Sequence, residues 1–189
     1  VIFDVSTDRG IRSGSQSIIE IMYRQLLRGL GYAGDLDLSE LEIALEGQGT
    51  LEAFKARYAE DFGAEWDADK GLLAIAVQRA SRVMHELDPV TYPSADSWTQ
   101  SALRRADVSA NGLAERCVEL LDRRRPGRNL VFVVDEVGQF VARDVQRMLD
   151  LQGAVQSLGR VGRGRLWLLV TSQERLNELV GGLDDKRVE

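Results

Sequence analysis

Three short, mainly apolar segments predict the strands of a parallel β-sheet. They occupy residues 1–5, 130–134 and 166–170. The second segment consists of five consecutive apolar residues, four of them β-branched or aromatic, which is typical of a strand buried on both faces of a sheet. We expect the three strands to be parallel neighbours, with 130–134 in the centre.

Apolar residues between the first two strands recur at helical spacing and predict a mostly helical segment. Capping residues, glycines and prolines mark where each helix begins and ends. The expected helices cover about 17–30, 39–47, 50–63, 67–87 and 109–125. A further helix should follow the second strand, with one apolar side formed by Val141, Val145, Met148, Val155 and Leu158. A basic glycine-rich turn at 159–165 and a helix at 174–180 complete the pattern.

Composition excludes several classes of protein. The 189 residues include 24 basic and 30 acidic side chains, and the net charge of −6 argues against a generally basic nucleic-acid-coating protein. A single cysteine and a single histidine exclude a disulfide framework and a zinc site built from several such ligands. No apolar run is long enough to span a membrane, so we expect a cytoplasmic protein.

Two carboxylates follow the second strand directly. Asp135 and Glu136 come after the apolar run 130–134, which is the Walker B pattern of P-loop ATPases. The carboxyl ends of parallel strands face the ligand crevice, so both side chains should lie at the active edge. There Asp135 can hold Mg²⁺ through water. Glu136 can act as the base that activates the water attacking a γ-phosphate.

Polar residues also follow the third strand. Thr171, Ser172 and Gln173 should lie at the same edge as Asp135. ATPases of the AAA+ and related classes carry a polar sensor residue at this place, so we expect Thr171 to take part in catalysis and Ser172 and Gln173 to bind the cofactor, ATP. Thr171 and Ser172 would equally serve as caps of the helix expected at 174–180.

A phosphate-binding loop is missing from the chain. None of the three lysines lies in a GxxxxGK[ST] context, and residues 10–15 are only a partial likeness. The chain also starts within a strand, without methionine. We therefore interpret it as an internal piece of a longer protein whose Walker A strand lies upstream, and a complete domain left after processing is the alternative.

The predicted fold class is α/β: a partial P-loop NTPase sheet of AAA+-like type with a helical insertion. Residues 1–31 form the first core strand and helix, and residues 32–126 form the insertion. Residues 127–189 hold the Walker B strand, a helix, the sensor strand and its following helix.

The motif block resembles a known family. VVDEVGQF (133–140), the block at 148–176 and the opening FDVSTDRGIRSGSQSI resemble the large P-loop ATPase of bacteriophage-exclusion (BREX) defence systems, of the BrxC/PglY type. The resemblance implies an oligomeric ATPase that uses ATP and Mg²⁺ and acts with other BREX subunits and DNA in phage resistance. It also implies that this piece alone is inactive.

Other interpretations stay open. The chain can instead be a non-hydrolysing scaffold with a P-loop fold, or part of a signalling ATPase. Arg160, Arg163 and Arg165 form either a solvated turn or contacts to phosphates or a neighbouring subunit.

Overall fold

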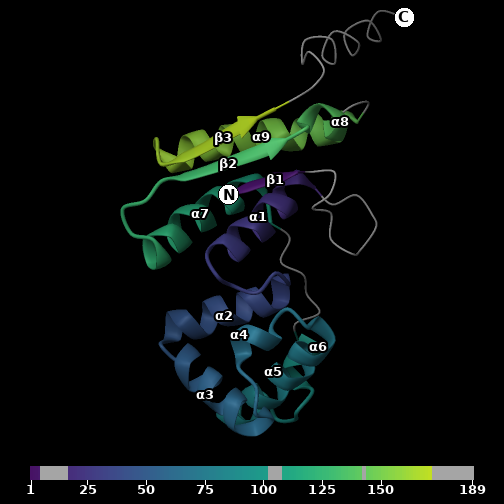
Figure 1. Ribbon diagram of the computed structural model, residues 1–189, viewed down its shortest axis with the longest axis vertical. Coiled ribbons are helices and arrows are strands. Elements are labelled where there is room, and N and C mark those ends of the chain that lie inside the picture. The colour runs from purple at the N-terminus through teal and green to yellow at the C-terminus, as the bar shows by residue number, and fades with distance from the viewer. Residues whose placement is uncertain (5–16, 102–107, 142–143, 172–189) are drawn as a thin grey trace, which may run out of the picture. The chain divides into compact units, whose positions relative to one another are not determined.

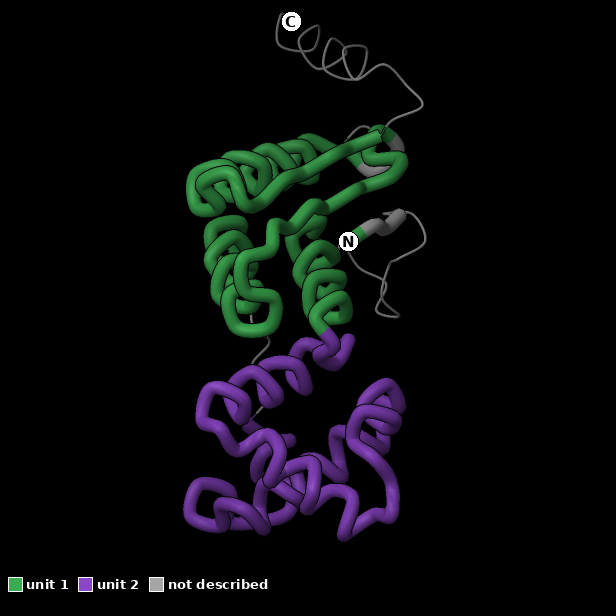
Figure 2. The backbone as a smooth tube through the Cα atoms, turned by 60° about the vertical axis from the view of Figure 1, so that its left-hand side comes forward, with its two compact units in different colours: residues 1–30, 108–189 green, residues 31–107 purple. Residues whose placement is uncertain are grey.

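The computed structural model describes residues 1–4, 17–101, 108–141 and 144–171, and it divides the chain into two compact units. Residues 1–30 and 108–189 belong to what we call the sheet unit, and residues 31–107 form the helical unit (Figure 2). The glycine-containing segment 10–15, Ser172, Gln173 and the helix expected at 174–180 lie outside the described residues.

The described part of the sheet unit contains a parallel sheet of three strands, β1 (Ile2–Asp4), β2 (Leu130–Asp135) and β3 (Leu166–Val170). The strand order is β1-β2-β3, and Val133 pairs with Ile2 on one side and with Leu169 on the other. The predicted arrangement, three adjacent parallel strands with 130–134 in the centre, is confirmed. The chain is thus an α/β protein.

Among the residues that the structure describes, four helices accompany the sheet (Figure 1): α1 (Ile18–Gly29), α7 (Ala110–Arg124), α8 (Val137–Val141) and α9 (Val145–Gly162). Helices α1 and α7 begin where the capping serines of the sequence predict. The Ser17 side chain accepts a hydrogen bond from the Glu20 amide at 3.2 Å, and Ser109 accepts one from Gly112 at 3.1 Å. These bonds satisfy amides that a helix leaves unpaired in its first turn.

The sheet has one covered face and one open face among the described residues. Leu130, Phe132, Val134 and Leu166 are buried, and α1, α7 and α9 pack against one another. On the opposite face Val131, Trp167 and Leu169 are 37%, 55% and 56% exposed. The prediction that 130–134 is buried on both faces is therefore wrong for the described chain. Strands added in one direction with right-handed crossovers place their connecting helices on the same side.

The turn after α9 is shorter than the sequence suggested. The helix continues through residues 159–162, so only Arg163, Gly164 and Arg165 connect it to β3. Val145 and Val155, expected on the apolar side of this helix, are exposed, whereas Leu151, Ala154 and Leu158 are buried. The small residues Ala154 and Gly153 allow close packing on α7, and this contact selects the buried side.

The helical unit contains α2 (Leu36–Gln48), α3 (Leu51–Phe62), α4 (Trp66–Asp69), α5 (Leu73–Leu87) and α6 (Ser97–Ser101). Two expected boundaries are wrong. Asp35 caps α2, and Ser39 lies inside the helix with its hydroxyl bonded to the Leu36 carbonyl. The single helix expected at 67–87 is broken at Lys70–Leu72, where Gly71 lies. The range 32–126 includes α7, which packs with α9 in the sheet unit.

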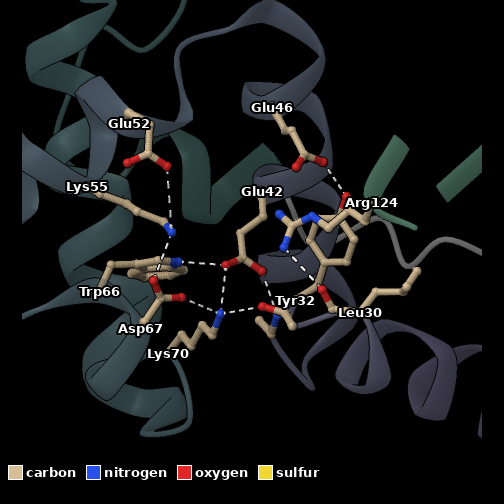
Figure 3. A network of polar contacts seen from close by, with 12 residues as sticks. Leu30, Tyr32, Glu42, Glu46, Glu52, Lys55, Trp66, Asp67, Lys70 and Arg124 are labelled. Carbon is tan, nitrogen blue, oxygen red and sulfur yellow. Dashed lines mark hydrogen bonds and ion pairs between the residues drawn. The ribbon is translucent and has the colours of Figure 1, made fainter. Parts of the chain in front are cut away.

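Aromatic side chains and a buried carboxylate organise the helical unit. Phe54, Tyr58 and Trp66 are fully buried, and the ring centroids of Phe54 and Tyr58 lie 5.1 and 5.3 Å from that of Trp66. Figure 3 shows Glu42 beside Trp66, accepting hydrogen bonds from the Trp66 indole at 2.8 Å and from Lys70 at 3.3 Å. Because every oxygen of this buried carboxylate has donors, the cost of burying its charge is offset.

Candidate active site at the carboxyl ends of the strands

The turn after β2 brings the predicted acidic pair to the edge of the sheet. Asp135 is the last residue of β2 and is exposed, and Glu136 follows in the turn that leads into α8. The φ angle of Glu136 is 52°, in the left-handed region that residues other than glycine rarely adopt. Strained backbone of this kind costs on the order of 1–3 kcal/mol and is concentrated at functional sites.

Hydrogen bonds from β3 hold this turn in place. The Glu136 amide donates to Asp135 Oδ1 at 3.0 Å and to Thr171 Oγ1 at 3.1 Å. The Thr171 hydroxyl donates to Asp135 Oδ1, and the Val137 amide donates to the Thr171 carbonyl at 3.0 Å. Two predicted catalytic residues, Glu136 and Thr171, and the predicted metal ligand Asp135 therefore form one connected cluster.

The cluster suits a hydrated magnesium ion better than a metal enclosed by protein ligands. Asp135 and Thr171 offer hard oxygen donors, which Mg²⁺ prefers. Among the residues that the structure describes, no group of three or more His, Cys, Asp or Glu side chains is placed to hold a metal ion. An ion at this edge would keep several water ligands, as Mg²⁺ usually does with phosphate-bearing ligands.

A second aspartate ends a strand at this edge of the sheet. Asp4 ends β1 and lies opposite Asp135 in the register of the two strands. The sequence does hold this aspartate, inside the segment 1–5 that predicts the first strand. A single aspartate within a short apolar segment does not form a motif, so the pattern gives it no role.

The arginines of the α9–β3 turn lie at the other end of the sheet. Arg163 and Arg165 precede β3, whereas Thr171 follows it. The five residues of β3 separate Arg165 from Thr171. This step of six positions along a strand corresponds to about 20 Å. These arginines and the acidic cluster of the same chain therefore do not form one site.

The single cysteine and the single histidine of the chain both lie in places where they contribute to packing or hydrogen bonding. Burial raises the pKa of the Cys117 thiol to about 12, and the side chain is fully enclosed in α7. A thiol with that pKa is not a nucleophile near neutral pH. The His85 Nδ1 atom lies 2.6 Å from the Tyr92 carbonyl, a contact that ties α5 to the following turn.

Comparison with protein-family models and with solved structures found no match for this chain. Within the described ranges, no helix combines the length and apolar character needed to cross a membrane.

Proposed function

We propose that this chain is the Walker B and sensor portion of an ATP-hydrolysing, AAA+-like P-loop ATPase. The observation that carries the proposal is the hydrogen-bonded cluster of Asp135, Glu136 and Thr171 at the ends of two adjacent parallel strands. The left-handed backbone of Glu136 adds support, because a strained residue that carries a carboxylate at a ligand edge is suited to chemistry.

Each residue of the cluster has a role in this proposal. Asp135 would hold Mg²⁺ through water, and Glu136 would accept the proton of the attacking water. Thr171 would contact the γ-phosphate or that water, with Ser172 and Gln173 following it near the nucleotide. The ion itself would neutralise charge on the phosphates.

The biological setting follows from the sequence resemblance alone. We propose a role in a BREX phage-defence complex with other subunits and DNA, in the cytoplasm, as part of an oligomer. The Walker A strand would belong to the longer parent protein. This piece by itself would bind ATP weakly, because it lacks the main phosphate cradle.

A scaffold function is the second candidate. The same hydrogen bonds that join Asp135, Glu136 and Thr171 also fasten the ends of β2 and β3 together. A protein that had lost hydrolysis would keep these contacts for stability.

ATP hydrolysis by the full-length parent protein separates the two candidates. We expect Glu136→Gln to retain nucleotide binding and to lower turnover by about 10²-fold or more, the usual scale for loss of a general base. Asp135→Ala should weaken the binding of Mg²⁺-ATP, and Thr171→Ala should slow turnover with a smaller effect on binding.

Asp150→Asn is the matched control, because its carboxylate accepts a hydrogen bond from Gln146 on the same helix at 2.9 Å and takes no part in the hydrogen bonds of the cluster. Wild-type turnover in all three test variants would reject the proposed site. A parent protein without ATPase activity in the presence of its partners would favour the scaffold.

A further inference from the structure

The edge of the sheet opposite the acidic cluster carries a concentration of arginines. The loop between α7 and β2 and the turn between α9 and β3 both lie at this edge, at the amino ends of the strands (Figure 1). Residues 123–128 and 159–165 contain seven arginines and no acidic residue: Arg123, Arg124, Arg125, Arg128, Arg160, Arg163 and Arg165. In a chain of net charge −6, this is a local basic surface.

Part of this charge is not neutralised within the described residues. Arg165 is anchored, because it donates to both carboxylate oxygens of Asp122, at 3.2 and 2.6 Å. Arg123 pairs with Glu119 at 3.0 Å. Four arginines of these two segments form no ion pair with any described carboxylate: Arg125, Arg128, Arg160 and Arg163.

The two basic segments form a continuous surface. The Leu130 amide donates to the Arg165 carbonyl at 2.8 Å, and the Arg165 guanidinium also approaches the Arg128 carbonyl at 3.5 Å. Arg160, Arg163 and Arg165 line a depression of about 720 Å³ beside α7. Glu115 also lines it, and its carboxylate accepts a hydrogen bond from Asn111 at 2.6 Å.

An exposed aromatic side chain lies beside the same turn. Trp167 is 55% exposed, and its indole nitrogen donates to the Gly164 carbonyl at 2.9 Å. Arg163 and Gly164 have φ angles of 46° and 84°, and this left-handed pair folds the turn back toward the indole. The other two tryptophans, Trp66 and Trp98, are buried, so Trp167 alone among them is available to a ligand.

We propose that this edge binds single-stranded nucleic acid, and we call it the arginine edge. One guanidinium group can donate two parallel hydrogen bonds to the oxygens of a phosphate. The four arginines without ion pairs are spread over two segments, and this spacing suits a chain of phosphates better than one isolated anion. Trp167 supplies a surface on which an unpaired base stacks. An acidic protein surface would use the arginines but would gain nothing specific from the indole.

Fluorescence anisotropy with a labelled single-stranded oligothymidylate tests the proposal in the whole chain without ATP. Wild-type protein should bind it, with affinity that falls between about 50 and 200 mM salt. The double variant Arg160→Gln/Arg163→Gln should lower the slope of log affinity against log salt by about 1.4, since each phosphate contact to a single strand contributes about 0.7. Trp167→Ala should weaken binding at least about fivefold.

Arg116→Gln is the matched control, because Arg116 is on α7 and pairs with Glu119 at 3.1 Å. It should leave both affinity and salt slope unchanged. A second readout is quenching of tryptophan emission by the oligonucleotide, which should be lost in Trp167→Ala.

Several results would overturn the proposal: no binding by the wild type at low salt, equal effects of the double variant and Arg116→Gln, or tighter binding of a duplex of the same length. Competition by polyglutamate as strong as by the oligonucleotide would point to an acidic protein partner instead. None of these outcomes depends on ATP hydrolysis, so the arginine edge and the proposed ATPase fail independently.

Discussion

At the residue scale, Glu42 shows how much one buried charge depends on its neighbours. It is 1% exposed and accepts hydrogen bonds from the Trp66 indole, the Lys70 ammonium and, at 2.5 Å, the Ala33 amide. Its donors come from α4, from the residue that ends α4 and from the segment before α2. The carboxylate therefore joins parts of the helical unit that are distant in sequence.

Replacing Glu42 by alanine should destabilise the helical unit strongly. The change leaves a buried indole N–H, a backbone N–H and a largely buried ammonium without their acceptor, which costs about 3–5 kcal/mol when a buried pair is broken. Glu52→Ala is the control, because Glu52 is 87% exposed and pairs with Lys55 at 3.8 Å, so its loss should cost less than about 1 kcal/mol. Chemical denaturation followed by tryptophan fluorescence measures both, and equal effects would contradict this assignment.

The reactivity of Cys117 measures how tightly the sheet unit is packed around α7. Burial raises the pKa of its thiol to about 12 and encloses the side chain, so we expect almost no reaction with a thiol reagent at pH 8 in the native protein. Denaturant should restore the reaction rate of an ordinary cysteine. Because the chain has no other cysteine, the native rate reports local opening around α7. Rapid labelling without denaturant would show that α7 is poorly packed.

At the element scale, the open sheet face is the feature that local pattern did not predict. The run at 130–134 is apolar throughout, and a continuous apolar run gives no sign of which side is covered. Among the described strands, β3 is also an outer strand, so its free edge and the exposed Trp167 and Leu169 lie together. Such exposed strands promote association with other chains.

Leu169→Lys should reduce self-association. Leu169 is 56% exposed on the open face, so the lysine places a charge where a second apolar surface would pack without creating a cavity in the core. Size-exclusion chromatography with light scattering, over a wide range of protein concentration, measures the change. Val90→Lys adds the same charge at a 91% exposed position in the helical unit and should leave association unaltered. Similar behaviour of the two variants would mean that the open face does not mediate contact.

At the scale of the whole molecule, charge is divided between the two units. Residues 31–107 contain 15 acidic and seven basic side chains, which leaves the rest of the chain with 15 acidic and 17 basic ones. The acidic excess lies in the helical unit, where several carboxylates are engaged in ion pairs. Acid should therefore weaken this unit through specific contacts.

Asp67 provides the pH prediction. Partial burial raises the pKa of Asp67, but hydrogen bonds from Lys55 and Lys70 outweigh it and hold the pKa below its ordinary value of 3.8. A lowered folded-state pKa means that the stabilising contribution is complete above pH 3.8 and disappears as the pH falls through the lower folded value. We therefore expect the melting temperature of the helical unit to decrease as the pH is lowered below 3.8. Trp66 and Trp98 fluorescence measures this melting temperature.

Asp67→Asn should lower the melting temperature at pH 7. It should also reduce the loss of melting temperature below pH 3.8, because an asparagine side chain takes up no proton in that range. Asp96→Asn, at an exposed position before α6, should keep the wild-type profile. If Asp67→Asn loses as much melting temperature below pH 3.8 as the wild type does, other carboxylates cause the acid destabilisation.

The sequence by itself determined the three strands, their parallel order and most helix boundaries. Apolar runs, capping serines and glycines are local signals, and right-handed connections leave few arrangements for parallel strands. It also placed Asp135, Glu136 and Thr171 at one edge, because the carboxyl ends of parallel strands share an edge.

Tertiary structure alone decided the rest. The hydrogen bonds among Asp135, Glu136 and Thr171, the open face of the sheet and the arginine edge depend on segments distant in sequence that meet only in the folded chain. At the break in the helix expected at 67–87, Lys70 contacts the Gly31 carbonyl and Glu42, partners that no local pattern encodes. Local propensity is a weak preference that such long-range contacts override.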